Sequence, residues 1–283
     1  MNGVAGPDGA GDDPLTLGGP AAGRRGHQRR RKVRAAVAAV VVLGVVAAVL
    51  AIRNAIDGLD TSTQAVNPAV RWEWLFLRDR TFEELREATI EHLYLTVVAV
   101  TVGFVLAAAL AAIAIRFRWT FSPITAFTGF LYTIPSVALF GVLTTRLSNF
   151  QAAEIALISY TLLILVRNMV AGIDGVSSAV TDAADGMGMS RARRLATVEI
   201  PLALPVIIAG LRVATVTTIG LVAISSIIQL GGLGDLIFAG FRDQFYTEMV
   251  VGSVLSIIVA VVLDLALFQL ERSLTPWSRR RVA

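Results

Sequence analysis

Asp182-Ala-Ala-Asp-Gly-Met-Gly-Met-Ser-Arg-Ala-Arg-Arg-Leu-Ala-Thr-Val-Glu-Ile-Pro201 stands between two long apolar runs, residues 152–173 and 201–230. The stretch is longer than a hairpin connection, and its charges are of both signs. Each neighbouring run approaches or exceeds the roughly 20 apolar residues that a helix needs to cross a bilayer. The stretch is therefore a structured connection between two membrane-spanning helices and not a disordered linker.

This connection predicts two short helices separated by a turn. Ser178 is suited to cap the first helix, and Gly186 and Gly188 permit the turn after it. Ser190 is suited to cap the second helix, because its hydroxyl can accept a hydrogen bond from a free backbone N–H. Pro201 disfavours helical backbone at the residue before it, so we expect the second helix to end there.

The first predicted helix has an apolar face and an acidic face. Ala183 and Ala184 lie on the apolar face, and Asp182 lies on the acidic one. Together with Gly188, these small side chains allow another protein's surface to approach the backbone closely. The helix is therefore suited to insertion into a groove on a partner protein.

The chain as a whole is strongly apolar. Of its 283 residues, 55% are hydrophobic and 16% are charged, whereas soluble domains have about a quarter charged. Pro135 interrupts the third apolar run and Pro205 stands early in the fifth, which predicts kinks. We predict an all-α polytopic membrane protein with about six transmembrane helices, at residues 35–52, 93–115, 123–145, 152–173, 201–230 and 249–270.

Composition argues against several kinds of chemistry. The chain has no cysteine, hence no disulfide and no thiolate site, and its two histidines, His27 and His92, leave little for zinc. Much of the basic excess behind the net charge of +4 lies in the terminal segments, so a nucleic-acid partner is not indicated. We predict no catalytic residue and no metal site.

Changes in composition divide the chain into five parts. Residues 1–34 form a basic tail with too few apolar side chains for a core, which predicts disorder. Residues 35–52 form an extra first span, because the run is long for a signal peptide and lacks a small-residue cleavage site. Residues 53–89 form an external loop whose acidic, helix-prone end leads into the next span. Residues 90–270 form the transmembrane domain, and residues 271–283 form a cytoplasmic tail.

The distribution of Arg and Lys predicts the orientation. With the N-terminus inside, the cytoplasmic segments hold 16 basic residues and the opposite side holds seven. Arg167 and Arg212 fall within apolar runs and are left out of this comparison. We therefore expect a multi-pass protein of the bacterial inner or plasma membrane, with both termini in the cytoplasm.

The connection resembles the conserved loop of bacterial ABC importer permeases: Glu-Ala-Ala, three residues, Gly, nine residues, Ile, one residue, Leu-Pro. Here Asp182 replaces Glu, Val198 replaces Ile and Ile200 replaces Leu, at unchanged spacing. The resemblance implies a type I ABC importer permease core, in which this loop forms coupling helices that dock on a separate ATPase. It implies a coupling role for Asp182, Ala183, Ala184, Gly186, Gly188, Ser190, Ile200 and Pro201.

The resemblance covers roughly residues 90–270 and narrows to one substrate class. Residues 132–139, 186–190, 200–210, 231–238 and 263–276 are similar to permeases that import glycine betaine, choline, carnitine or proline as osmoprotectants. Permeases for methionine resemble part of this pattern too, so methionine or another amino acid is the alternative cargo.

The same resemblance implies the partners of the chain. It implies a cytoplasmic ABC ATPase dimer that binds ATP and Mg²⁺, an extracytoplasmic substrate-binding protein and a second permease subunit, either the same chain or a paralogue. The bilayer is the remaining partner, and this chain itself binds no cofactor.

The third apolar run is one candidate for the translocation path. Thr133 and Ser136 flank the break at Pro135, and a broken helix exposes carbonyl groups to a cavity. A purely structural kink is the alternative.

The connection between the last two runs is a second candidate. Gly231, Gly232 and Gly234 lack the Lys-Ser/Thr of a phosphate-binding loop. They form an external gate, a docking surface for the binding protein, or simply a tight turn between spans.

Ionisable residues within the apolar runs are few, which argues against a proton-coupled carrier. We expect those present to lie at the interface or to form Arg–carboxylate pairs: Glu154, Arg167, Arg212 and Asp264. A carrier without an ATPase and a membrane scaffold remain the alternatives from other functional classes.

Overall fold

The computed structural model describes Arg71, Trp74 and residues 81–277, which belong to one unit, Ala65–Ala283. The predicted tail, the first span and nearly all of the external loop up to residue 80 lie outside the described residues, as do residues 278–283. The predicted transmembrane domain, residues 90–270, lies entirely within the described part.

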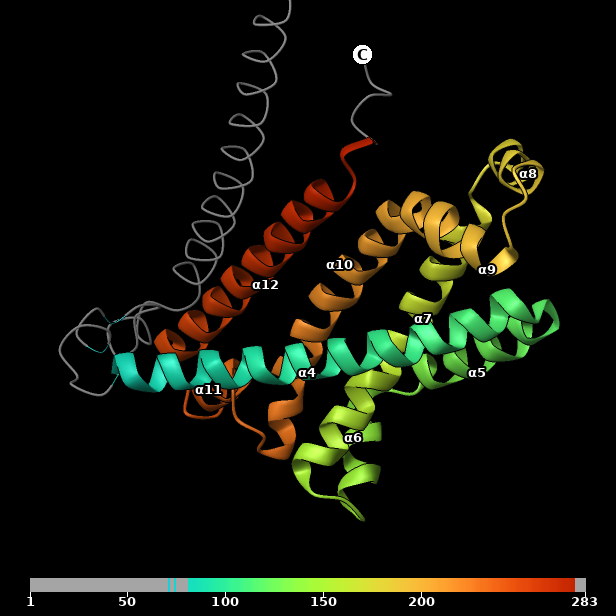
Figure 1. Ribbon diagram of the computed structural model, residues 1–283. Coiled ribbons are helices and arrows are strands. Elements are labelled where there is room, and N and C mark those ends of the chain that lie inside the picture. The colour runs from blue at the N-terminus through green and yellow to red at the C-terminus, as the bar shows by residue number, and fades with distance from the viewer. Residues whose placement is uncertain (1–70, 72–73, 75–80, 278–283) are drawn as a thin grey trace, which may run out of the picture. The chain divides into compact units, whose positions relative to one another are not determined.

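Every regular element in this part is a helix (Figure 1). Four helices are long and apolar enough to cross a membrane, and the bent pair α5–α6 makes a fifth if it counts as one span. The all-α prediction is confirmed, and the exact number of spans stays a prediction. The elements are α4 (Thr81–Arg116), η1 (Arg118–Thr120), α5 (Phe121–Thr133), α6 (Ser136–Thr144), α7 (Asn149–Asp174), α8 (Ser178–Gly186), α9 (Arg191–Arg194), η2 (Leu195–Glu199), α10 (Ile200–Ser225), η3 (Ser226–Ile228), α11 (Leu233–Arg242) and α12 (Tyr246–Leu274).

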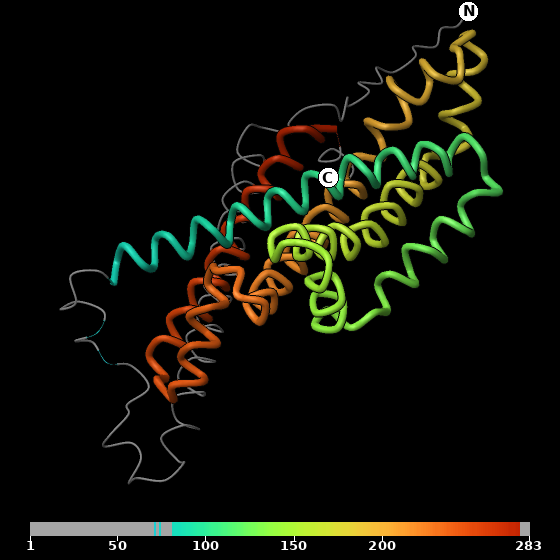
Figure 2. The backbone as a smooth tube through the Cα atoms, turned by 90° about the horizontal axis from the view of Figure 1, so that it is seen from below, coloured from blue at the N-terminus to red at the C-terminus, as the bar shows by residue number. Residues whose placement is uncertain are grey.

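Helix α4 begins well before the predicted span. The acidic segment from Thr81 to Glu91 is not separate from the apolar run but forms the first turns of a 36-residue helix. Such a helix is about 54 Å long at 1.5 Å per residue, longer than the roughly 30 Å hydrocarbon core. Figure 2 shows the chain turning back at the end of α4 into α5.

Close packing of α4, α7 and α10 depends on glycines. A Cβ on Gly103 would lie 2.0 Å from Thr161 Oγ1, and a Cβ on Gly210 would lie 2.4 Å from Asn168 Cβ. Gly172 lies against the carbonyl of Ala203 in the same way. Because these glycines have no side chain, α7 packs closely against both α4 and α10. Helix α10 also packs against α4 and α12.

Pro135 interrupts the helical run of α5 and α6, as predicted. Ile134 and Pro135 have extended backbone, with ψ of 128° and 129°, and the helices on either side are bent by 87°. The Tyr160 hydroxyl on α7 donates a hydrogen bond to the carbonyl of Ile134. The break is thus fixed by a contact to a neighbouring helix.

The predicted Arg–carboxylate pair forms between α10 and α12. Arg212 donates two hydrogen bonds to Asp264, at 2.7 and 2.8 Å. Glu154 differs, because it is 6% exposed and neither carboxylate oxygen has a hydrogen-bond partner among the described residues. Arg167 is exposed on α7.

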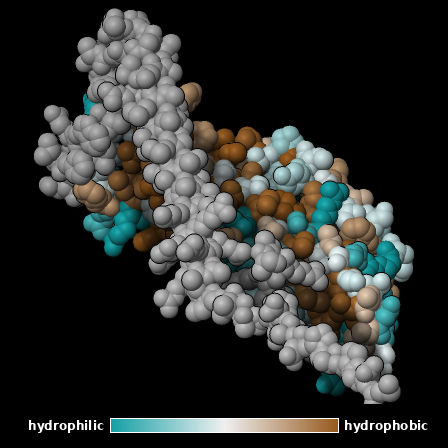
Figure 3. All heavy atoms as spheres, turned by 90° about the horizontal axis from the view of Figure 1, so that it is seen from above, coloured by the Kyte–Doolittle hydropathy of each residue, from teal (hydrophilic) through white to brown (hydrophobic). Residues whose placement is uncertain are grey.

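Large apolar side chains remain on the surface of the helices. Val105, Val142 and Val262 are each more than half exposed. Between the grey atoms, Figure 3 shows apolar residues along the middle of the visible face and more hydrophilic ones toward its ends. A surface of this kind is suited to lipid or to another membrane subunit.

Candidate functional site

The predicted coupling connection is a short helix followed by a tight turn. Helix α8 begins at Ser178 with Ser177 at the N-cap position and no side-chain capping bond, so the predicted cap at Ser178 is wrong by one residue. After α8, the Met189 N–H donates to the Ala184 carbonyl and the Gly188 N–H to the Asp185 carbonyl. These two bonds, with Gly188 at φ 75°, make a Schellman motif. Glycine fits this position because left-handed backbone is costly for other residues.

The second part of the connection does not end at Pro201. The Ser190 hydroxyl accepts a hydrogen bond from Arg193 N, so this predicted cap is confirmed. The helix then continues from Arg191 to Ile228, and the prediction that Pro201 ends it is wrong. Residues 195–199 form a wider π-helical turn, with the Ile200 N–H bonded to the Leu195 carbonyl. A wider turn gives room to the proline ring, which would clash in a regular helix.

The predicted coupling residues are not equally accessible. Asp182, Ala183, Gly186, Gly188, Ser190 and Ile200 are exposed, and Pro201 is half-buried. Ala184 is 1% exposed, so its side chain faces the chain itself and is not available to a partner. Met187, at 69% exposed, presents a large apolar side chain at the same end of α8.

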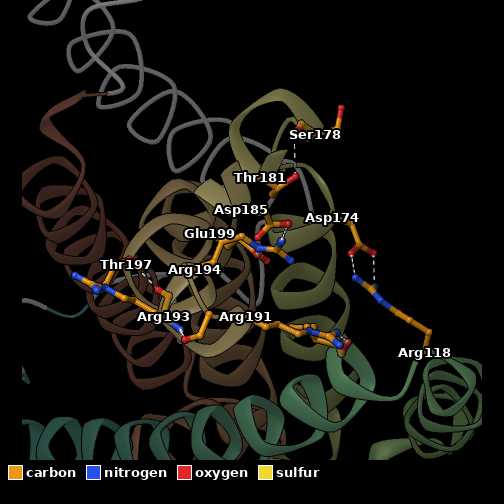
Figure 4. Close-up of polar contacts among 12 residues, drawn as sticks. Arg118, Asp174, Ser178, Thr181, Asp185, Arg191, Arg193, Arg194, Thr197 and Glu199 are labelled. Atoms are coloured by element: carbon orange, nitrogen blue, oxygen red, sulfur yellow. Dashed lines mark hydrogen bonds and ion pairs between the residues drawn. The ribbon is translucent and has the colours of Figure 1, made fainter. Parts of the chain in front are cut away.

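A cluster of charged residues holds this end of the molecule together. Figure 4 shows Arg194 between Asp185 of α8 and Glu199, which directly precedes α10. Sequence reasoning missed this arrangement, since Asp185 and Arg194 are nine positions apart in the sequence and the turn at Gly188 lies between them. The only hint in the sequence was that Asp185 and Arg194, of opposite charge, stand on the two sides of the predicted turn.

Two further arginines join this end to α4 and α7. Arg191 donates to the carbonyl of Ile115, at the end of α4. Arg118 donates two hydrogen bonds to Asp174, at 2.6 and 3.0 Å, with both side chains about half exposed. Exposed pairs of this kind contribute about 1 kcal/mol or less.

The glycine-rich candidate lies at the opposite end of α10. Gly231 and Gly232 have φ of 88° and 78°, and the Gly232 N–H donates to Glu91 Oε2 of α4 at 3.0 Å. Gly234 lies against the carbonyl of Ala223, with no space for a side chain. The segment is therefore more than a tight turn between spans. A hydrogen bond to Glu91 holds it against α4, and it leads directly into helix α11.

Helix α11 has one buried and one exposed side. Leu233 is fully buried and packs with Ile219 and Val259, whereas Phe241 is 72% exposed. The pKa of the Asp235 carboxyl lies above its usual value because the group is partly buried, and a hydrogen bond with Ser226 only partly opposes this rise. The helix thus presents an aromatic residue at the end of the molecule away from α8.

The residues at the break between α5 and α6 form a third candidate site, separate from the α8 end and from the glycine-rich turn. Thr133 and Pro135 are exposed and Ser136 is half-buried. The Thr133 hydroxyl donates to the carbonyl of Phe130 and so caps the last turn of α5. Among the described residues, no group of three or more His, Asp or Glu side chains is placed to hold a metal ion.

The sequence from residue 99 to residue 280 matches the family described as binding-protein-dependent transport system inner membrane component. The chain belongs to this family of ABC importer permeases. Its members are transport subunits and not enzymes, and the ATPase of such a system is a separate chain. Family membership therefore removes the alternatives of an ATP-independent carrier and of a scaffold.

Curated relatives match about two thirds of this chain. The osmoprotectant import permease protein OsmW of Salmonella typhimurium is 35% identical over 68% of this chain and 92% of its own length. The glycine betaine/carnitine/choline transport system permease protein OpuCB of Bacillus subtilis is 34% identical, over 68% and 89%. The choline transport system permease protein OpuBB of Bacillus subtilis is 34% identical, over 70% and 92%.

Solved structures share the fold. The inward-facing MetNI methionine ABC transporter has a chain that matches with a TM-score of 0.62 and 20% identity, covering 70% of this chain and 99% of that chain. An amino acid ABC transporter crystallised with histidines gives a TM-score of 0.60 and 19% identity, over 69% and 95%. These likenesses confirm the predicted permease architecture.

Proposed function

We propose that this chain is the translocating subunit of an importer for osmoprotectants such as glycine betaine, choline, carnitine or proline. The observation that carries the proposal is the match to curated osmoprotectant permeases at 33–35% identity. Methionine, the alternative cargo, is supported by a solved methionine transporter that shares the fold at 20% identity, and an identity this low supports the fold alone. The proposed cargo is therefore a small zwitterion or cation with a quaternary or secondary amine.

The α8 end is the proposed docking site for a cytoplasmic ATPase dimer that binds ATP and Mg²⁺. The exposed side chains of Asp182, Ala183 and Met187 are supporting observations, because a docking helix needs an accessible surface with small or flexible side chains. The proposal places both chain termini in the cytoplasm, in agreement with the basic residues on that side.

The α11 end is the proposed external face. The turn of Gly231 and Gly232 would form a gate there, and α11 would bind the substrate-binding protein. The hydrogen bond from the Gly232 N–H to Glu91 of α4 supports the gate, since it holds the turn against a long helix of the membrane domain. Thr133, Pro135 and Ser136 are proposed to lie along the translocation path.

A second permease subunit, either a copy of this chain or a paralogue, would complete the path. Exposed apolar side chains on the helices supply the surface. Transport then proceeds by alternating access: ATP closes the two ATPase subunits, α8 follows them, and the permease pair rocks between two states.

Purification of the complex tests the assignment of class and cargo together. The chain would be isolated from native membranes in mild detergent, and its partners identified by mass spectrometry. An ATPase should be recovered, and its turnover in the presence of the binding protein should rise with choline, glycine betaine or carnitine. Stimulation by methionine alone would assign the alternative cargo, and recovery of no ATPase would overturn the proposal.

Variants of α8 test the docking site separately. Ala183→Glu adds a charge on an exposed position and should abolish recovery of the ATPase, whereas Ala183→Ser should not. Gly188→Arg should act likewise, with Gly188→Ala as the control that carries the same backbone strain without the bulk. Ala184→Glu is unsuitable, because burial of Ala184 means that it would disturb the fold of the loop. Normal ATPase recovery with Ala183→Glu and Gly188→Arg would contradict the docking site.

A further inference from the structure

Apolar packing alone does little to hold helix α8 against the rest of the chain. Of its nine residues only Ala184 is buried. A hollow of about 470 Å³ lies beside it, lined by Val180 of α8, by Leu202 and Pro205 of α10, and by Trp277. A helix with one buried side chain and a hollow at its flank has no core of its own to set its position.

One guanidinium group supplies a direct link between α8 and α10. Arg194 Nε donates a hydrogen bond to Glu199 Oε1 at 2.7 Å, and Arg194 Nη1 donates to Asp185 Oδ2 (Figure 4). Asp185 belongs to α8, and Glu199 is the last residue before α10. The planar guanidinium fixes both acids relative to each other, which the single ammonium group of a lysine does not do.

The two halves of this link differ in exposure. The Arg194 side chain is 20% exposed and Glu199 10%, whereas Asp185 is 51% exposed. Partly buried ion pairs are less screened by salt and water than exposed ones. Glu199 therefore anchors the arginine at the base of α10, and Asp185 attaches α8 to it.

The anchor lies where α10 can respond. Glu199 ends the π-helical turn of residues 195–199, and such turns interrupt the regular hydrogen-bond ladder of a helix. Beyond it, α10 packs directly against α7, α4 and α12. A displacement applied at Glu199 thus reaches the centre of the described helices.

We propose that Arg194 is the positioning residue that transmits a displacement of α8 to α10 during transport. The inference rests on the proposed docking of an ATPase at α8. Arg194 touches neither nucleotide nor substrate in this role, and acts only through Asp185 and Glu199. Arg118 and Arg191 hold other parts of this end, but neither bridges α8 and α10.

The test is transport per ATP hydrolysed by the complete importer in proteoliposomes. Arg194→Gln keeps a long polar side chain but loses the charge, and should lower substrate transported per ATP by at least tenfold while the ATPase remains bound. Arg194→Lys keeps the charge but loses the planar, fixed donor geometry of the guanidinium, and should recover only part of the coupling. Arg193→Gln, at the exposed neighbour, is the matched control and should transport as the unchanged protein does.

A double-mutant cycle identifies the link. Asp185→Asn should also uncouple, and in combination with Arg194→Gln it should add no further loss, because both substitutions break the same bridge. Thermal unfolding of each purified variant checks that the fold is retained. Unchanged transport per ATP in Arg194→Gln, or an equal loss in Arg193→Gln, would overturn the inference.

Failure of this inference is distinguishable from failure of the proposed docking site. Loss of the ATPase from the Arg194→Gln complex would mean that Arg194 serves docking or loop folding and not transmission, which also overturns the inference. Retention of the ATPase by Ala183→Glu and Gly188→Arg would instead remove the docking site itself.

Discussion

Gly188→Ala is expected to loosen the turn after α8 by a calculable amount. Gly188 has φ 75°, and a Cβ placed on it would meet nothing within 4 Å. The substitution therefore carries no steric clash, and its cost is that of left-handed backbone alone, about 1–2 kcal/mol. An energy of that size changes an opening equilibrium by a factor of about 5 to 30.

Hydrogen–deuterium exchange measures this directly. The Met189 amide donates to the Ala184 carbonyl across the turn, so its protection reports the Schellman motif. In nanodiscs, when the turn closes faster than exchange occurs, the amide should exchange about 5 to 30 times faster in Gly188→Ala. Gly188→Asn should show a smaller effect, because asparagine tolerates this conformation better than alanine.

Gly186→Ala is the control within the same helix. Gly186 is helical and a Cβ there also meets nothing within 4 Å. Alanine favours helix over glycine by up to about 1 kcal/mol, so protection at Met189 should be equal or higher. Equal exchange rates in Gly188→Ala and Gly186→Ala would refute the argument from backbone conformation.

Three further substitutions test the packing of the helices, each by thermal unfolding in nanodiscs. Gly210→Ala should destabilise the protein by about 1–3 kcal/mol, because the new Cβ would lie 2.4 Å from Asn168 Cβ. Gly220→Ala is the control, since a Cβ there meets nothing within 4 Å and should cost no stability. Equal melting temperatures of the two variants would contradict the close approach of α7 and α10. Asp264→Asn should destabilise by about 1.5–3 kcal/mol through its bonds to Arg212, and the double variant with Arg212→Gln should cost less than the sum of the two, so strict additivity would count against a coupled pair. Glu154→Leu should leave stability unchanged or raise it, because it removes a buried carboxylate without a partner among the described residues; a lower melting temperature in the assembled importer would reveal a partner for Glu154 there.

The break at Pro135 and the turn at Gly188 were predictable because their causes are local. A proline ring limits the backbone of its own residue and of the one before it, and a glycine alone adopts left-handed backbone at little cost. Apolar runs of sufficient length predicted the spanning helices in the same way, since a helix is the element that satisfies its own backbone in lipid.

Pro201 shows where local reasoning failed. The constraint that a proline places on its predecessor favoured a helix end, but a π-helical turn at residues 195–199 absorbs it and the helix continues into α10. Packing of α10 against α7, α4 and α12 stabilises a continuous helix. These partners lie far away in the sequence, so no short sequence window shows that stabilisation.

The sequence by itself determined the class of protein, the long apolar helices and the position of the connection between α7 and α10, because hydrophobic length, proline and glycine act over a few neighbouring residues. Tertiary structure alone decided that Ala184 faces inward, that Glu91 holds the turn of Gly231 and Gly232, and that Arg194 joins Asp185 to Glu199. These contacts link residues on different helices or across a turn. Their geometry follows from how the helices pack, and the order of residues along one helix does not contain it.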